Sequence, residues 1–173
     1  MSLPRREHLF WISGTPPAGN RGTFDVRRVE TNDDVVAMQS IFAEAHDYAE
    51  ELTGAMYGES VRVGTDLTGW IAWDGADAVS FTIVTRVGPS LGLWEVMTPV
   101  RHRRRGAARA VVSAALAGVA QAAESDGQPI EQTLFWSSPA GQPLYAAMGF
   151  TVVDTIDAWA LGASAADLAA VGA

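Results

Sequence analysis

The fold of this chain is best inferred from one short stretch, Arg103-Arg104-Arg105-Gly106-Ala107-Ala108, which leads into an apolar helical pattern that runs to about Ala123. The dipole and the free backbone N–H groups of a helix N-terminus attract anions. Gly106 carries no Cβ, so the backbone there can approach a ligand closely. The arginines add charge-assisted hydrogen bonds to phosphate oxygens. The stretch therefore predicts a turn that binds a pyrophosphate in front of a helix.

Length and composition are those of an ordinary globular protein. The 173 residues suit one domain with a real core, and 48% of them are hydrophobic while 18% are charged. There is no cysteine, which excludes disulfides, thiolate metal sites and cysteine nucleophiles. No apolar run approaches the roughly 18–20 residues that span a bilayer, and the apolar stretch at 9–12 is too short for a signal-peptide core. We therefore expect a cytoplasmic protein without a membrane partner, and the sequence is compatible with a homo-oligomer.

Charge is distributed unevenly along the chain. The net charge of −8 argues against a nucleic-acid partner, because such proteins carry a basic footprint. Residues 30–66 hold nine acidic side chains and one arginine, whereas residues 101–109 hold five arginines and no acid. The acidic segment is either a solvated surface or a rim that attracts cations. The three histidines have no ligand spacing, so we expect no metal site.

Periodicity and turn signals predict an α/β protein in which helices pack on a mixed sheet. Strands are expected at 9–13, 24–29, 70–73, 78–87, 91–98, 131–136 and 151–161, and helices at about 33–52, 107–124 and 139–148. The pair Asp74-Gly75 predicts a hairpin. Thr31 or Asn32 is expected to cap the first helix, and residues 54–68 are expected to be irregular. Three tryptophans are expected in the core and one beside a pocket: Trp70, Trp73 and Trp136, and Trp94.

This order of elements, with the motif Arg103-x-x-Gly106-x-Ala108 after a strand, resembles the GNAT acetyltransferase superfamily. A second block, Pro143-Leu144-Tyr145-Ala146-Ala147-Met148-Gly149-Phe150, is similar to the late helix and turn of that family. The two blocks stand in the family's order, separated by a helix and a strand. The resemblance implies a splayed central sheet flanked by helices. It assigns residues 24–161 to the acetyltransferase domain, residues 1–23 to an N-terminal extra strand and linker, and residues 162–173 to a C-terminal tail.

The resemblance implies acetyl-CoA as the cosubstrate, bound between the strands that end at Thr98 and Trp136. Backbone N–H groups from about Arg104 to Ala108 would hold the pyrophosphate. Main-chain groups of the preceding strand would hold the pantetheine arm and polarise the thioester carbonyl. An asparagine that is common near the family's second block is replaced by serine here. The cofactor-binding residues expected on these grounds are Val96, Met97, Thr98, Arg103, Arg104, Arg105, Gly106, Ala107, Ala108 and Ser138.

Two residues are candidates for catalysis. Tyr145 matches the tyrosine that protonates the departing CoA thiolate in the family, and the alternative is a packed aromatic side chain with a satisfied hydroxyl. A tyrosine with an ordinary pKa near 10 is protonated at neutral pH and can donate. Glu95 lies in an otherwise apolar strand. It is either the base that deprotonates the amine, directly or through water, or the ion-pair partner of an arginine.

The expected function is therefore transfer of an acetyl group from acetyl-CoA to a primary amine of a small molecule or peptide. The resemblance implies direct attack by the amine, with no covalent enzyme intermediate. The acidic segment at 30–66 favours an acceptor that is cationic before it reacts. The alternative function is a catalytically silent module that binds acyl-CoA or regulates another protein. The presence of Tyr145 beside an intact loop favours the enzyme.

Overall fold

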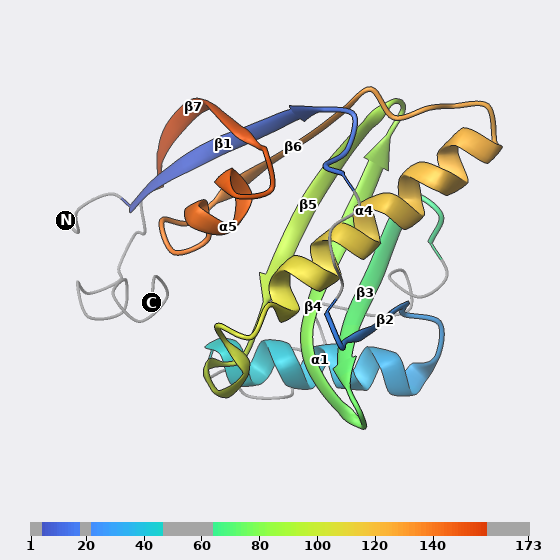
Figure 1. The fold of residues 1–173 in the computed structure, drawn as a ribbon, viewed down its shortest axis with the longest axis vertical. Coiled ribbons are helices and arrows are strands. Elements are labelled where there is room, and N and C mark those ends of the chain that lie inside the picture. The colour runs from blue at the N-terminus through green and yellow to red at the C-terminus, as the bar shows by residue number, and fades with distance from the viewer. Residues whose placement is uncertain (1–4, 18–21, 47–63, 159–173) are drawn as a thin grey trace.

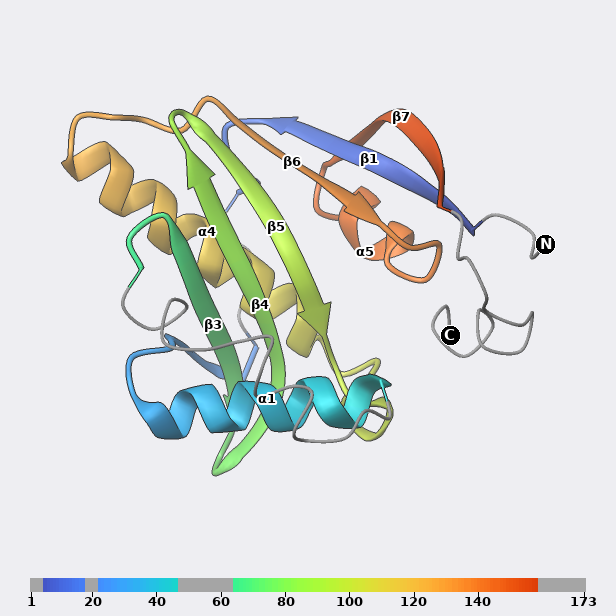
Figure 2. The same cartoon turned by 180° about the vertical axis from the view of Figure 1, so that it is seen from behind.

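The computed structural model describes residues 5–17, 22–46 and 64–158. Within these ranges the chain forms one seven-stranded mixed sheet and three α-helices, which confirms the predicted α/β class (Figures 1 and 2). Several predictions fall outside the described residues. These are the extension of the first helix to residue 52, most of the irregular segment at 54–68, the end of the last strand and the tail at 162–173.

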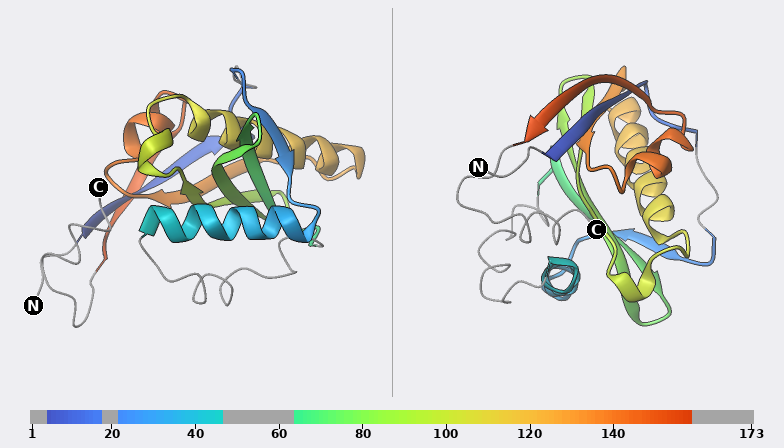
Figure 3. Two further views of the ribbon diagram at one scale, coloured as in Figure 1. Left: turned by 90° about the horizontal axis from the view of Figure 1, so that it is seen from below. Right: turned by 90° about the vertical axis from the view of Figure 1, so that its left-hand side faces the viewer.

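The predicted strands and helices are present, with shifts at their ends. The strands are β1 (Arg5–Ser13), β2 (Asp25–Arg28), β3 (Leu67–Asp74), β4 (Asp77–Val87), β5 (Ser90–Met97), β6 (Gln132–Ser137) and β7 (Thr151–Ala158). The helices are α1 (Asn32–His46), α4 (Ala107–Ser125) and α5 (Gln142–Ala146), with a 3₁₀ turn η1 (Val100–His102). The order in the sheet is β2-β3-β4-β5-β6-β1-β7, and β5 with β6 is the parallel pair. Helices α4 and α5 cover one face and α1 lies on the other (Figure 3).

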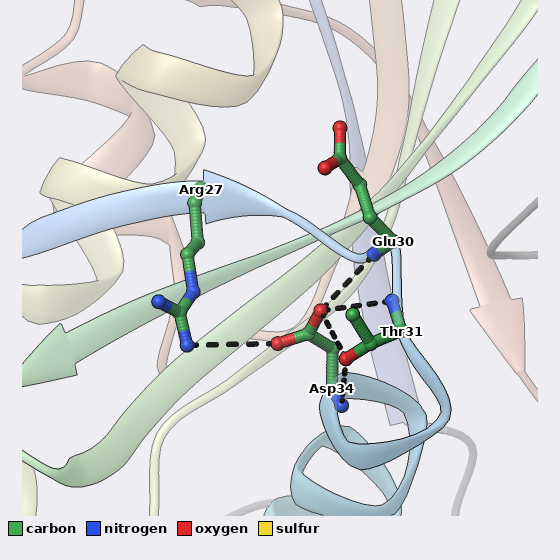
Figure 4. A network of polar contacts seen from close by, with 4 residues as sticks. All are labelled: Arg27, Glu30, Thr31 and Asp34. Atoms are coloured by element: carbon green, nitrogen blue, oxygen red, sulfur yellow. Dashed lines mark hydrogen bonds and ion pairs between the residues drawn. The ribbon is translucent and has the colours of Figure 1, made fainter.

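Helix α1 starts at a reciprocal cap, shown in Figure 4. The Asp34 N–H donates to the Thr31 hydroxyl oxygen at 3.1 Å, and the Thr31 N–H and hydroxyl donate to the Asp34 carboxylate at 3.0 and 2.8 Å. Burial alone would raise the pKa of the Asp34 carboxyl, but hydrogen bonds from Thr31 and Glu30 and the charge of Arg27 hold that pKa below its ordinary value. Of the two caps that the sequence allowed, Thr31 and Asn32, the structure has Thr31, which fixes where α1 begins.

Helix α4 lies close to the sheet because Gly118 faces an aromatic ring. A Cβ built on Gly118 would lie 2.4 Å from Cη2 of Trp70. The Trp70 indole is itself held, since its Nε1–H donates to the Thr68 hydroxyl at 3.1 Å. This contact fixes the height of α4 above β3. The N-terminus of α4 is thereby held at the end of β5, where the predicted phosphate-binding turn lies (Figure 1).

The N-terminal strand β1 lies inside the sheet. It pairs antiparallel with β6 from His8–Ser137 to Ser13–Gln132, and with β7 from Arg5–Ala158 to Trp11–Thr151. In the described sheet, β7 is the edge strand and reaches β6 only through β1. Strand β1 belongs to the segment at 1–23, which the resemblance does not cover. This strand therefore joins β7 to β6 in the sheet.

The sheet splays between β5 and β6, as the resemblance implies. These two strands pair only from Ser90 to Gly92 with Gln132 to Leu134, after which they diverge (Figure 2). On its other side β5 contains a bulge, because Phe81 faces Met97 while Ile83 faces Trp94. One residue of β4 thus opposes two residues of β5 at this point. The divergence leaves the end of β5 without a strand partner on the β6 side.

Candidate active site

A cavity of about 1540 Å³ opens where β5 and β6 separate. It is lined by the two strands, the turn before α4, and α5 with the loop that precedes it. The structure brings nearly all of the predicted site residues to this cavity, from four segments of the chain. They are Glu95, Val96, Met97, Thr98, Arg103, Arg104, Gly106, Ala107, Ala108, Ser138 and Tyr145. Arg105 is the predicted residue that does not line it.

The turn before α4 presents a series of free backbone donors. Arg104 and Gly106 have φ angles of 64° and 91°, so the chain enters the left-handed region twice within three residues. The first hydrogen bond of α4 runs from the Ala110 N–H to the Gly106 carbonyl at 3.0 Å. Within the part of the chain that the structure describes, the N–H groups of residues 104 to 109 have no acceptor. Such a nest at a helix N-terminus is an anion-binding concavity.

The arginines of the turn have different roles. The Arg103 Nε–H donates to the Thr98 carbonyl at 3.1 Å, which ties the turn to the end of β5. The Arg104 side chain lines the cavity and has no ion-pair partner among the described residues, so its guanidinium is available to an anion. Arg105 instead forms an ion pair of 2.5 Å with Asp74 at the β3–β4 hairpin. Its charge therefore anchors the turn to the sheet.

Buried hydroxyl groups of β4 hold the bulge in β5. The Thr82 hydroxyl donates to the Trp94 carbonyl at 3.0 Å, and the Ser80 hydroxyl donates to the Met97 carbonyl at 2.7 Å. Both side chains are fully buried. Sequence analysis missed these two residues, because alternation of polar and apolar residues in β4 is typical of a strand with one solvated face. Here the polar face is covered by α4.

The bulge places Glu95 in a strained conformation at the cavity wall. Its φ of 50° lies in the left-handed region, which costs a non-glycine residue about 1–2 kcal/mol. Strain of this kind collects at functional sites, where the surrounding structure holds it in place. The hydrogen bonds from Ser80 and Thr82 on either side of Glu95 supply that support. The carboxylate of Glu95 is partly exposed and lines the cavity.

Tyr145 combines a packed ring with a free hydroxyl. The ring is only 5% exposed and packs against Phe10, Phe135 and Phe150, with its centroid 4.4 Å from that of Phe135. Burial raises the pKa of the hydroxyl well above its ordinary value, so it stays protonated. Its hydroxyl has no hydrogen-bond partner in the described ranges. It is also not one of the polar atoms in those ranges that are both unpaired and inaccessible to solvent. The hydroxyl therefore keeps contact with the cavity.

The loop before α5 is packed tightly on the end of β6. A Cβ on Gly141 would lie 2.6 Å from Ser137 Oγ and 3.0 Å from Cε2 of Tyr145. The Gly141 N–H donates to the Ser138 carbonyl at 3.0 Å, which closes the turn. Glycine at 141 thus lets α5 bring Tyr145 against β6. Ser138 lines the cavity beside it.

Trp136 is not in the core, contrary to the expectation from the sequence. Its side chain is 37% exposed and lines the cavity, because β6 turns Phe135 inward and Trp136 toward the face that α1 leaves open. Trp94 lines the cavity as predicted. Glu7 and Leu9 of β1 line it too, and sequence analysis missed both, because only the tertiary fold brings β1 to β6.

Among the solved proteins with a similar structure, several are named as N-acetyltransferases. The sequence itself matches no protein-family model and no curated protein. The GCN5-related N-acetyltransferase from Sphaerobacter thermophilus superposes with a TM-score of 0.66 and 16% identity, over 88% of this chain and 50% of that chain. The GCN5-related N-acetyltransferase from Kribbella flavida gives 0.61 and 14%, over 89% and 57% of the two chains. This chain thus spans about half the length of these two proteins.

A shorter neighbour is matched over its whole length. AAC(6')-Iy, solved in complex with the bisubstrate analogue CoA-S-monomethyl-acetylneamine, superposes with a TM-score of 0.63 and 16% identity, over 82% of this chain and 100% of that chain.

Helices that could span a membrane are absent from the described residues. The same residues contain no group of three or more histidine, aspartate or glutamate side chains placed to hold a metal ion. The splayed mixed sheet and these neighbours agree, and the chain has the fold of the GNAT acetyltransferases.

Proposed function

We propose that this protein transfers an acetyl group from acetyl-CoA to a primary amine, by direct attack of the amine on the thioester. The observation that carries the proposal is the set of free N–H groups of residues 104 to 109, in a turn whose residues, Arg105 excepted, line the cavity between β5 and β6. These donors, the α4 dipole and the Arg104 guanidinium would hold the pyrophosphate of CoA. Ala107 and Ala108 keep the approach open, since they are small.

The pantetheine arm would lie along the free edge of β5. Backbone groups of Val96, Met97 and Thr98 line the cavity there, and the strand has no partner on that side. An N–H group of this edge would hydrogen-bond to the thioester carbonyl oxygen and stabilise the negative charge that develops when the amine attacks. Ser138, across the cleft on the loop after β6, would add a hydrogen bond to the cosubstrate.

Tyr145 would act on the leaving group. When the C–S bond breaks, the thiolate needs a proton or a strong hydrogen bond, and the buried Tyr145 hydroxyl keeps its proton for this purpose. Its raised pKa means that tyrosinate is costly to form. A hydroxyl with a raised pKa is a weaker acid, and it would help by donating a hydrogen bond to the sulfur as negative charge develops there. The aromatic cluster around the ring fixes the direction of that bond.

Glu95 would act on the attacking amine. An amine is nucleophilic only as the free base, so a proton must leave the ammonium before or during attack. The Glu95 carboxylate lines the same cavity and is held by the bulge, so it would accept this proton directly or through a water molecule. Two arginines near the cleft pair with other carboxylates, Arg101 with Glu44 and Arg105 with Asp74.

The acceptor would be a cationic amine of a small molecule or peptide. Glu7 and Glu95 both line the cavity, which supports binding of a cation there. The acidic segment at 30–66 gives less support than its composition suggests. Of its described carboxylates, Asp34, Glu44 and Asp66 are already paired with arginines. Because acetyl-CoA is the proposed donor, the proposed location is the cytoplasm.

The proposal is tested by binding and by turnover. Acetyl-CoA at about 100 times its dissociation constant should stabilise the protein by roughly 2.7 kcal/mol, measured as a thermal shift. Release of free CoA thiol should then depend on an added primary amine. Absence of a thermal shift with millimolar acetyl-CoA or CoA would show that the phosphate site is misassigned. Binding without thiol release for any class of amine would instead favour the catalytically silent module.

A further inference from the structure

Three tryptophans lie on one face of the sheet, in an area that none of the described helices covers. In the register of the strands, Gly92 of β5 pairs with Leu134 of β6, Leu134 pairs with Trp11 of β1, and Leu9 pairs with Trp136. Paired residues share a face, so Trp11 and Trp136 project from the same side of the sheet, which is also the side of Trp94. Helix α1 packs on β4 and the neighbouring part of β5 but leaves this area uncovered (Figure 2). We call Trp11, Trp94 and Trp136, with Leu9 and Leu134, the tryptophan face.

Two of the indoles are held in place by hydrogen bonds. The Trp94 Nε1–H donates to the Thr85 hydroxyl at 2.9 Å, and the Trp11 Nε1–H donates to the Gln132 side-chain oxygen at 3.0 Å. Gln132 is held in turn by Ser90 at 3.0 Å. A Cβ on Gly92 would lie 3.1 Å from Trp94 Nε1, so the indole lies close over the glycine. These rings are fixed, yet Trp94 remains 54% exposed and Trp11 37% exposed.

The tryptophan face continues into the proposed active site. Trp94, Trp136, Leu9 and Leu134 line the same cavity as Tyr145. The carboxylates of Glu7 and Glu95 line it as well, and Glu95 follows Trp94 directly in the chain. Apolar ring surface and negative charge are thus combined in this cavity. The positive charges of Arg103 and Arg104 come from a different segment, the turn before α4.

We infer that the acceptor is an amine carried on a flat aromatic group, with the ring on the tryptophan face and the ammonium near Glu95. This inference rests on the proposed function and names its substrate class. Fixed indoles offer stacking to an aromatic ring and a cation–π contact to its ammonium, with little loss of side-chain entropy on binding. An aliphatic amine without a ring would make the cation–π contact but would gain no stacking on the indoles.

The test compares two primary amines, 2-phenylethylamine and propylamine, in the acetyl-CoA-dependent reaction. Trp94→Leu and Trp136→Leu should each raise KM for 2-phenylethylamine about tenfold. They should change KM for propylamine less than twofold, measured at saturating acetyl-CoA. Trp136→Phe should raise KM for 2-phenylethylamine much less than Trp136→Leu does, because phenylalanine keeps an aromatic ring at this position. Val153→Ser is the matched control, since Val153 is 56% exposed on β7 and does not line the cavity.

Failure of this inference is separable from failure of the proposed function. Calorimetry of 2-phenylethylamine with the CoA-bound protein measures binding to the tryptophan face without turnover. If Trp136→Leu weakens this binding, the inference is supported even when no acetyl transfer is seen. Equal use of the two amines, or equal effects of the tryptophan variants on both, would overturn it. It is also overturned if Trp136→Leu converts a dimer into monomers, because the face would then be covered by a second copy of the chain.

Discussion

Replacement of Gly106 by aspartate or asparagine separates charge from shape at the proposed phosphate site. Gly106 has a φ of 91°, so either side chain strains the backbone by about 1–2 kcal/mol. A Cβ at this position meets no atom within 4 Å, so neither variant collides with the protein. Aspartate and asparagine are nearly the same size. The two variants should therefore unfold at similar temperatures and differ only in how they bind an anion.

The size of the charge effect follows from Coulomb's law. A carboxylate about 6 Å from one phosphate charge costs about 0.7 kcal/mol at the dielectric constant of water and about 2.8 kcal/mol at an effective dielectric constant of 20. These limits correspond to roughly 3-fold and 100-fold losses of affinity per phosphate charge. The asparagine amide carries no charge and escapes this penalty. Free N–H groups on both sides of Gly106 make this the position where the difference should be largest.

Isothermal titration calorimetry with CoA measures this difference. Gly106→Asp should bind CoA at least about threefold more weakly than Gly106→Asn at low ionic strength. The gap should narrow in high salt, because screening shortens the Debye length from about 10 Å at 0.1 M to about 3 Å at 1 M. Thermal unfolding without ligand is the control for equal stability. Equal affinities of the two variants for CoA would refute the assignment of this turn to the phosphates.

The remaining predictions concern catalysis, pH and packing. Tyr145→Phe should lower kcat about 10²-fold or more while CoA affinity stays unchanged, and a loss smaller than about threefold would return Tyr145 to a packing role. Burial raises the pKa of Tyr145 in the folded state above its unfolded value near 10, so the unfolded chain loses its proton first as pH rises. The wild type should therefore lose about 1.4 kcal/mol of stability per pH unit above pH 10 relative to Tyr145→Phe, and parallel urea-denaturation curves against pH would contradict this. Glu95→Gly should relieve the strain at φ 50° and raise stability by up to about 1 kcal/mol while lowering turnover; Glu95→Gln, which keeps the strain, should lower turnover alone. Gly118→Ala should destabilise the fold, because a Cβ 2.4 Å from the Trp70 ring costs about 1–3 kcal/mol and helix propensity returns only about 1 kcal/mol. An unchanged urea midpoint would show that α4 can move away from β3.

Features encoded in neighbouring residues could be predicted from the sequence. The hairpin at Asp74-Gly75, the cap at Thr31 and the turn before α4 each depend on a few adjacent residues, whose backbone preferences and hydrogen bonds are local. The order of strands and helices also follows from local periodicity. This order supported the family resemblance, and the resemblance in turn implied the splayed sheet. The candidate cofactor residues at the glycine turn could be proposed from the sequence, because backbone N–H groups there do not depend on distant contacts for their direction.

Features that depend on distant pairs were decided only by the tertiary structure. Arg105 and Arg104 are neighbours in one basic run, yet Asp74 of a remote hairpin pairs with Arg105 and leaves Arg104 at the cavity. Trp136 is as apolar as a core residue, but the pleat of β6 turns it to a face that no described helix covers. Insertion of β1 between β6 and β7 brings Glu7 to the cleft and Phe10 against Tyr145. Pairing of strands across long stretches of chain sets these neighbours, because a residue's own preferences fix its local conformation but not which partner it meets.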